Sequence, residues 1–455
     1  MIPALKNLQK SYVAALFAGI ILSIFIYVWI FGVNILYLDE WSFVPLVKEA
    51  QTHGISFDML FKQHNEHRVF FPRLFYLAML PVSQMNSKLF MFMNMIMLFI
   101  VFSCFYLIAK KQFSFSLSKI PVWIIIIPLF VFNFRQSQNL LWAFQIAFYM
   151  VLTFAVLSLF FVEKAYSVSI PYLKPVYLFL AVLFAIIATY SSAMGAMVWI
   201  AGGVLLQIKN NYKNGKQIQP WLIILSWIII GSIAVYFYYS GLQSTIKQNL
   251  FYLLAHPFKF IHFFFSLISL TSVHSLSIIA FPIGIFIFSI SIFVLFKTYS
   301  NKRLKENGFW VAIYVFSMMF LIITTIGRSP IAFEYTDRAR YTIFSSLFIL
   351  SAFMMFYDNY RVSTIRYEKK TFQFFFVFLI LLALELNAIG IAFGIKEKRE
   401  KKHFTEVVLN YKNKPVSIGI KNMYKWCTDT VFLNMVDKSV PYIEKNHYNI
   451  FAETK

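Results

Sequence analysis

Long apolar runs with almost no charged residues recur along this sequence, and they constrain its fold more than any other feature. A bilayer core of about 30 Å is crossed by a helix of about 20 apolar residues. Eleven runs meet or approach that length, and we predict an all-α integral membrane protein with about eleven transmembrane helices. The candidate spans lie near residues 12–33, 89–109, 120–134, 140–162, 175–190, 193–208, 221–240, 276–296, 309–326, 341–357 and 372–395. The run at 120–134 is short, so we expect neighbouring helices to support it or the bilayer to thin around it.

The composition agrees with this class of protein. Apolar residues make up 60% of the chain and charged residues only 13%, whereas a soluble domain has roughly 45–50% and about 25%. The 41 basic residues outnumber the 19 acidic ones and give a net charge of +22. In a membrane protein this excess indicates topology and contact with lipids, and we expect no nucleic-acid partner. The two cysteines do not form a disulfide framework, and the first apolar run is too long for a cleavable signal peptide.

The positive-inside rule predicts the orientation. Most loop lysines and arginines face the cytoplasm if the N-terminus is cytoplasmic, and eleven spans then place residues 396–455 outside. Residues 249–272 are apolar enough for a twelfth span, but accepting it would put the basic segment 297–305 outside. We therefore interpret 249–272 as an interfacial or re-entrant helix broken at His256–Pro257, and 69–81 as an interfacial segment. The predicted organisation is a transmembrane domain, residues 1–395, with a large first outer loop at 34–87, followed by the outer tail, in the plasma or inner membrane.

Asp39 and Glu40 open the first outer loop, a few residues after the first span. A carboxylate held at the membrane surface can meet an acceptor hydroxyl from the aqueous side and a partner carried by a lipid. Partial desolvation raises the pKa of such a group toward that of a useful general base. The alternative is that Asp39-Glu40-Trp41 is a polar boundary with an interfacial aromatic anchor.

A second polar cluster follows at residues 63–73. If this segment is helical, His64, His67 and Arg68 project from one side, because positions i, i+3 and i+4 share a face. They would then offer imidazole and guanidinium donors to a phosphate, for which arginine provides a bidentate fork. A divalent metal held by His64, Glu66 and His67 is an alternative, although the spacing differs from that of zinc proteases. A solvated loop surface is the third reading.

Two further outer segments carry cations. Arg135 begins five consecutive polar residues after the third span, and an arginine-rich segment leads into the tenth. Three arginines outside the membrane break the local charge rule, so a carboxylate of the first loop or an anionic lipid phosphate is expected to compensate them. An Arg–Asp pair that braces two helix ends is the alternative. The residues concerned are Arg328, Glu334, Asp337, Arg338, Arg340 and Tyr341.

With these residues in view, the chain resembles the GT-C superfamily of polytopic membrane glycosyltransferases, which take a sugar from a polyprenyl-phosphate carrier on the non-cytoplasmic face. The match is the acidic pair Asp39-Glu40 just after the first span. A largely uncharacterised bacterial branch is similar over a longer set of motifs. These are Asp39-Glu40-Trp41, His64-Asn65-Glu66-His67-Arg68, Phe71-Pro72-Arg73-Leu74, the small-residue turn Ser191–Gly195 and the ending Tyr448-Asn449-Ile450-Phe451-Ala452.

The chain departs from that pattern in two places. Ala339-Arg340-Tyr341 stands where Ser-Arg-Tyr is expected, and Met194 stands where Asn is expected. The Trp-Trp-Asp motif of oligosaccharyltransferases is absent, so transfer to protein asparagine is not supported. The departures at Ala339 and Met194 bear on which substrate is used more than on the fold.

The resemblance implies an inverting glycosyltransferase that moves a sugar to a cell-envelope glycan or lipid acceptor. Asp39 would be the general base and Glu40 would assist or orient it. No cofactor is certain, and a divalent metal stays open. The expected phosphate- or substrate-binding residues are His64, Glu66, His67, Arg68, Arg73, Arg135, Arg328, Arg338, Arg340 and Tyr341.

Two other functions remain open from the sequence. A polysaccharide or lipid transporter, or flippase, would use an intramembrane carboxylate such as Glu385 in the last apolar run. A membrane scaffold would bind a partner through the outer tail and would depend on no single loop residue. Neither the sugar nor the acceptor can be named from the sequence.

Overall fold

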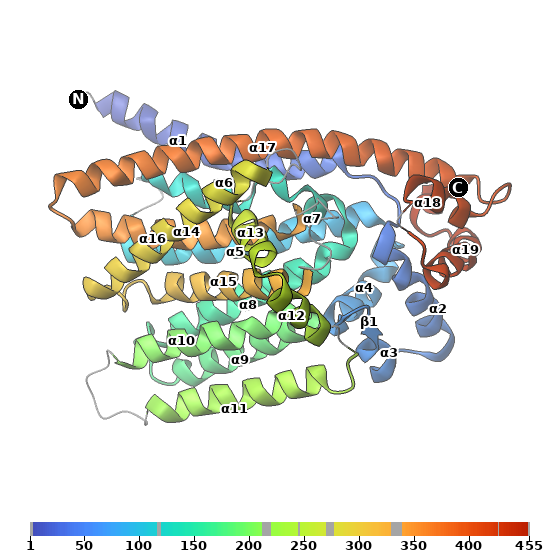
Figure 1. Ribbon diagram of the computed structural model, residues 1–455, viewed down its shortest axis with the longest axis horizontal. Coiled ribbons are helices and arrows are strands. Elements are labelled where there is room, and N and C mark those ends of the chain that lie inside the picture. Colours follow the sequence, from blue (N-terminus) through green and yellow to red (C-terminus); the bar gives the residue numbers. More distant parts are fainter. Residues whose placement is uncertain are drawn as a thin grey trace.

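The computed structural model describes residues 3–115, 120–211, 220–243, 246–269, 277–328, 339–425 and 427–453. The structure is 84% helical, which confirms the all-α class. Most helices run side by side along the long axis of the molecule (Figure 1). Their bounds are α1 (Pro3–Phe31), α2 (Phe43–His53), α3 (Phe57–Phe61), α4 (Phe70–Ser83), α5 (Ser87–Phe113), α6 (Ile126–Val131), α7 (Ser137–Leu141), α8 (Ile146–Ala165), α9 (Leu173–Ser191), α10 (Met197–Asn211), α11 (Pro220–Tyr239), α12 (Ile246–Ala255), α13 (Pro257–Ile268), α14 (Ser277–Ser300), α15 (Gly308–Arg328), α16 (Thr342–Val362), α17 (Arg366–Leu409), α18 (Val416–Met423) and α19 (Thr430–Lys445).

Short 3₁₀ helices and one small hairpin connect these elements. The 3₁₀ helices used below are η1 (Leu38–Ser42), η3 (Val122–Ile125), η4 (Phe134–Gln136), η5 (Ala143–Gln145), η6 (Ala193–Ala196), η8 (Ala339–Tyr341) and η9 (Asn449–Glu453). The strands β1 (Gln63–His64) and β2 (His67–Arg68) pair antiparallel in a two-stranded sheet.

Within the described residues, eight helical segments are long and apolar enough to cross a membrane, or nine if a bent pair counts as one span. The chain is therefore an all-α protein with the helices of a multi-pass membrane protein. The prediction of a break at His256–Pro257 is confirmed, because α13 begins at Pro257 and the chain bends by 106° between α12 and α13. The predicted count of eleven spans stays a prediction.

Two of the predicted spans do not form long helices in the described residues. The run at 120–134 divides into η3 and the six-residue α6, because prolines interrupt it, and it is buried inside the bundle. The run at 193–208 forms η6 and the 15-residue α10. The first predicted span lies in α1, which is 29 residues long and contains the apolar segment Ala15–Phe31.

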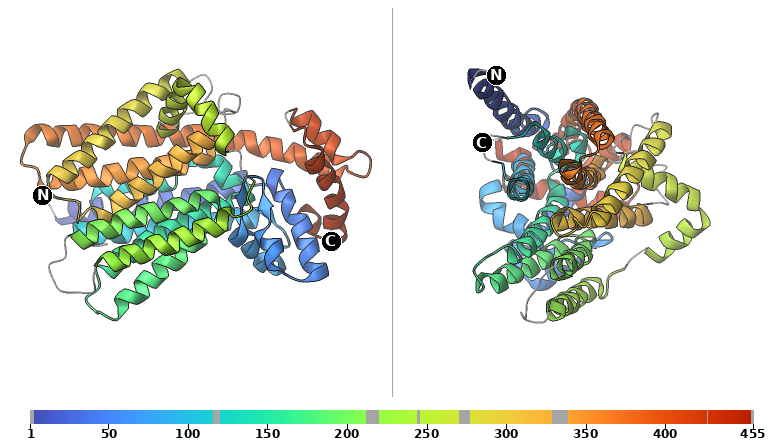
Figure 2. Two further views of the ribbon diagram at one scale, coloured as in Figure 1. Left: turned by 60° about the horizontal axis from the view of Figure 1, so that its bottom comes forward. Right: turned by 90° about the vertical axis from the view of Figure 1, so that its left-hand side faces the viewer.

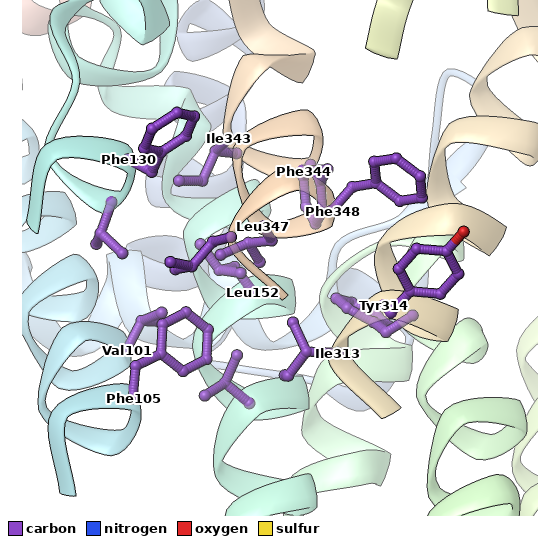
Figure 3. Packing of buried hydrophobic residues seen from close by; sticks show 14 of the residues in the cluster. Val101, Phe105, Phe130, Leu152, Ile313, Tyr314, Ile343, Phe344, Leu347 and Phe348 are labelled. Carbon is purple, nitrogen blue, oxygen red and sulfur yellow. The ribbon is translucent and has the colours of Figure 1, made fainter. Parts of the chain in front are cut away.

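The bundle core lies between α5, α6, α8, α15 and α16. Figure 3 shows its side chains interdigitating, among them Phe105, Phe130, Leu152 and Phe348, all of which are fully buried. Inside a bilayer such contacts stabilise through close packing, because lipid tails are as apolar as the side chains.

The first loop and the tail form a second hydrophobic cluster. Trp41 and Tyr76 from the loop are buried together with Val408 and Val436 from the tail. Residues 34–87 and 396–453 lie next to one another at the end of the bundle opposite the N-terminus (Figures 1 and 2). We call this end the loop end. The boundary predicted at residue 395 falls inside α17, which continues without a break to Leu409.

Close contacts hold α17 against the bundle near the loop end. Gly390 allows η4 to approach its backbone, since a Cβ atom at that position would clash with the carbonyl carbon of Phe134. The Tyr27 hydroxyl donates to the Gly390 carbonyl at 2.7 Å. Glu385, one turn away on α17, is exposed on the outside of the bundle.

Candidate functional site

Asp39 lies in η1, at the point where the chain leaves α1 and turns across the loop end. Its carboxylate is partly exposed, with Oδ1 3.9 Å from Nε2 of His64. Leu38, immediately before it, has a φ of +46°, a conformation that costs free energy in a residue other than glycine. The turn is therefore held by its surroundings.

The hairpin β1–β2 presents the second polar cluster to Asp39. The helical alternative considered for this segment does not occur: His64 pairs with His67 across two strands, and Gln63 pairs with Arg68. Asn65 forms the turn with a φ of +48°, which asparagine tolerates better than most residues. The Asn65 amide donates to the Asp39 carboxylate, so the turn of the hairpin caps the site.

Both histidines are neutral at pH 7. Burial lowers the pKa of His64 to about 4, and the positive charge of Arg73 adds to the effect. Burial also lowers the pKa of His67 to about 4, with a further contribution from Arg328. The contact between His64 and Asp39 is therefore one between a neutral ring and a carboxyl group, and Nδ1 of His67 is buried without a hydrogen-bond partner.

Cations from α15 and η8 complete the cluster. Arg340 and Arg328 both act on Asp39 and lower its pKa, and Arg328 also lies near Glu66. Arg328 donates a side-chain hydrogen bond to Tyr341. Nε of Arg340 is buried without a hydrogen-bond partner, and its carbonyl accepts from Asn139 at 2.7 Å. Arg338 falls outside the described residues.

The ionisation of Asp39 reflects two opposing effects. Burial raises the pKa of the carboxyl group above its ordinary value, while the two arginines and Asn65 oppose the shift. Burial is the larger effect, so Asp39 is a stronger base than an ordinary aspartate. The carboxylate is still exposed enough to meet a substrate.

Glu40 points away from that surface into the protein. It is 1% exposed, and its two oxygens accept from the Ser87 hydroxyl at 2.6 Å and the Ala143 amide at 3.0 Å. Burial raises the pKa of Glu40 to about 7. This carboxyl group joins η1 to the start of α5 and to η5, so its geometry suits orientation and not contact with a substrate.

Two of the predicted phosphate ligands, Arg68 and Arg73, donate hydrogen bonds to carbonyls within the fold. Arg68 donates to the carbonyls of Phe237 and Ser240 at 3.3 and 2.6 Å and packs over the Phe61 ring. Arg73 donates to main-chain carbonyls at the end of α3, among them that of Leu60 at 3.1 Å.

Arg135, in η4, is fully buried, with its guanidinium 4.9 Å from the centre of the Phe393 ring. Among the predicted residues, the structure therefore brings together Asp39, His64, Glu66, His67, Arg328, Arg340 and Tyr341.

Two hollows flank this cluster. An aromatic groove of about 550 Å³ is open to the outside beside the hairpin. A smaller polar pocket of about 100 Å³ lies between η1, α7 and α17 on the other side. The groove is lined by Phe57, Phe61, Arg68, Phe70, Phe71, Ile186, Tyr190, Phe237 and Ser240. The pocket is lined by Tyr37, Leu38, Gln138, Trp142, Arg340, Phe393, Lys396, Glu397, Glu400 and Lys401.

Among the residues that the structure describes, no group of three or more His, Cys, Asp or Glu side chains could hold a metal ion. Binding of a divalent metal by His64, Glu66 and His67 stays a prediction.

Comparisons with known proteins add no identification. A scan against protein-family models, a search of the curated proteins and a search of the solved structures each found no match.

Sequence reasoning missed two residues of the site. Asn65 was not predicted to form a turn or to contact Asp39, although an asparagine between two short polar segments is a turn signal. Lys401 is buried, donates to the carbonyl of Leu141 and acts on Glu40. It lies more than 300 residues from Asp39 in the chain, and no local pattern indicates that contact.

Proposed function

We propose that this chain is a membrane glycosyltransferase with a GT-C-like arrangement, which moves a sugar from a polyprenyl-phosphate carrier to a glycan or lipid acceptor. The observation that carries the proposal is the setting of Asp39. It is a partly exposed carboxylate with a raised pKa that faces a neutral histidine and two arginines at the end of a membrane bundle.

The proposed reaction uses Asp39 as the general base. The acceptor hydroxyl attacks the anomeric carbon and gives its proton to Asp39, while the bond between that carbon and the carrier phosphate breaks. The new bond forms on the face opposite the leaving group, so the configuration is inverted. A raised pKa brings the base closer to the operating pH and makes this proton transfer more favourable.

The leaving phosphate carries a developing negative charge. Arg340 and Arg328 would stabilise this charge, because fixed cations at the position where charge develops lower the barrier. Nε of Arg340 has an N–H to donate. In the absence of substrate, the same two cations balance Asp39 and Glu66.

The aromatic groove is the proposed site of the isoprenoid chain. Its lining is almost entirely apolar, Phe57 is 63% exposed, and Arg68 lies on its wall. A greasy chain in this groove would place its phosphate on the hairpin side of Asp39. The polar pocket on the other side has the aromatic ring of Trp142 and carboxylates such as Glu397, which suit the ring and hydroxyls of a sugar acceptor.

The proposed topology places the loop end outside the cell. The opposite end of the bundle holds basic residues such as Lys209, which pairs with Glu163, and Arg303, which pairs with Asp358. Cationic ends are retained in the cytoplasm. Glu385, which motivated the transporter hypothesis, is on the exposed face of α17, where it does not line a path through the bundle.

The test measures the transfer of labelled sugar from polyprenyl phosphate by membranes that contain this chain. The sugar on the donor is chosen by comparing the envelope glycans of cells that have the chain with those of cells that lack it. Asp39→Asn should reach the membrane in normal amounts and lose at least about 10²-fold of the transfer rate, as general bases contribute 10²–10⁴-fold. Asp58→Asn is the matched control, since Asp58 is exposed on α3 of the same loop. Transfer by Asp39→Asn at the rate of Asp58→Asn would remove Asp39 from this role.

A further inference from the structure

Asn449, in the C-terminal segment, is buried against the first outer loop. It begins η9, is 0% exposed and has a φ of +55°. Its side-chain oxygen accepts from the Leu36 amide at 3.3 Å. Its side-chain Nδ2 lies within hydrogen-bond distance of three acceptors. Its backbone N–H donates to the Gln84 carbonyl. The three acceptors are Asn34 Oδ1 at 3.1 Å, the Met85 carbonyl at 2.8 Å and Ser87 Oγ at 3.2 Å.

These contacts hold the chain both before and after Asp39. Leu36, whose amide donates to Asn449, lies three residues before Asp39. Ser87, the second contact, donates to the carboxylate of Glu40 immediately after it. The segment between these two points contains the left-handed Leu38. A strained residue of this kind persists only where the surrounding structure fixes it, and Asn449 supplies contacts on either side.

Polar contacts in a buried place are specific as well as stabilising. The Asn449 oxygen accepts from the Leu36 amide, and its two N–H groups are shared among the three acceptors. Each of these buried groups would cost free energy if it were left without a partner. Asn449 therefore fixes the distance between the end of α1 and the start of α5. η1 lies in the segment that connects α1 to α5, and Asp39 is on the partly exposed side of η1.

We propose that Asn449 is a positioning residue for Asp39: the C-terminal segment holds the strained turn at Leu38 and sets the direction of the general base. The inference rests on the proposed function. Asn449 touches no reacting atom, so its loss should change the rate of the chemical step more than the binding of the donor.

The variant that tests it is Asn449→Gly. Glycine adopts a φ of +55° without strain, so this change removes the side-chain hydrogen bonds and keeps the backbone. Asn446→Ala is the control, because Asn446 is in the same tail and donates only to the Tyr442 carbonyl within it. A second variant, Asn449→Asp, keeps the acceptor for the Leu36 amide and loses the donors to the other three groups.

Two measurements are made on the full-length chain in lipid. The first is kcat and KM for the polyprenyl-phosphate donor. Asn449→Gly should lower kcat about tenfold and leave KM within about twofold, with Asn449→Asp between it and the wild type. The second is hydrogen exchange at the Leu36 amide, which should become about tenfold faster in Asn449→Gly and stay unchanged in Asn446→Ala.

The outcomes separate the two proposals. A wild-type chain that transfers no sugar contradicts the proposed function, and the exchange measurement still reports on the contact. An active wild type with unchanged kcat in Asn449→Gly contradicts the positioning role. Unchanged exchange at Leu36, or a rise in KM as large as the fall in kcat, contradicts it as well, since the residue would then act on binding or not at all.

Discussion

Nε2 of His64 lies 3.9 Å from Oδ1 of Asp39, across the contact between the hairpin and the turn that follows α1. Because burial lowers the pKa of His64 to about 4, the histidine does not neutralise the carboxylate at pH 7. The charge of Asp39 is balanced by Arg340 and Arg328, which lie far from Asp39 in the sequence. The site is thus a carboxylate whose protonation depends on two arginines and on burial.

The pH dependence of transfer should follow Asp39. A general base works only when deprotonated, so kcat/KM should rise with pH through the pKa of Asp39 and then level off. Burial raises that pKa above the ordinary value of about 3.9 for aspartate. Arg340→Gln removes the charge that most lowers it, and the rising limb should therefore move to higher pH.

Arg340→Lys provides the control for this shift. The lysine keeps the positive charge and loses the planar fork, so the limb should stay near its wild-type position while the rate falls. A pH profile for Arg340→Gln that coincides with the wild-type profile would show that Arg340 does not act on the base.

The aromatic groove makes a prediction about donor chain length. Ile186→Trp places a larger ring in a groove of about 550 Å³ and should raise KM for a long polyprenyl-phosphate donor by about tenfold, with little change in kcat. The same variant should leave KM unchanged for a donor analogue with a short, water-soluble chain. Ile200→Trp is the control, since Ile200 is an exposed residue of α10 outside the groove. Equal effects of Ile186→Trp on both donors would place the lipid chain elsewhere.

The elements predicted from the sequence are those that depend on local pattern. Uninterrupted apolar runs indicate helices long enough to cross a membrane, and Pro257 after His256 indicates the break that the structure contains. The gathering of Asp39, Arg328 and Arg340 at one end followed from topology, since odd and even loops lie on opposite sides.

The features that were missed depend on contacts between distant parts of the chain. Residues 63–68 have no apolar periodicity that separates a helix from a hairpin, and pairing of His64 with His67 is decided by the turn at Asn65. Arg68 and Arg73 were expected to face a phosphate, but the carbonyls at the ends of α11 and α3 accept their hydrogen bonds. The sequence identifies an arginine, but it does not show which group accepts the hydrogen bonds of that arginine in the fold.

Glu40 predicts a stability that depends on pH. Its pKa is raised from 4.5 to about 7 in the folded chain, so the folded state binds more protons than the unfolded state between these values. Stability should therefore fall as the pH rises through this window. Glu40→Gln removes the ionisation and keeps a side chain that can bond to Ser87 and Ala143, so its Tm should exceed that of the wild type at pH 8 and be similar at pH 5.

Glu40→Ala distinguishes this effect from simple loss of contacts. It leaves the Ser87 hydroxyl and the Ala143 amide without their acceptor, and each unsatisfied buried group costs about 1–3 kcal/mol. Its Tm should be lower than that of the wild type at both pH values. Thermal unfolding in detergent, followed by intrinsic fluorescence, measures all three proteins, and a pH-independent difference for Glu40→Gln would contradict the raised pKa.

The proposed orientation can be read by cysteine labelling in intact cells. Both native cysteines are buried, so Cys104→Ala and Cys427→Ala should give a functional background without reactive thiols. In that background Asp58→Cys, on α3 of the first loop, should react with a membrane-impermeant maleimide added outside. Asn301→Cys, after α14 at the opposite end, should react only after the cells are opened.

The reverse pattern would place Asp39 in the cytoplasm, where a carrier-linked sugar displayed on the outer face cannot reach it, and would exclude the proposed reaction. Labelling of both positions in intact cells would show leaky cells, and a cytoplasmic marker protein labelled in the same sample controls for that.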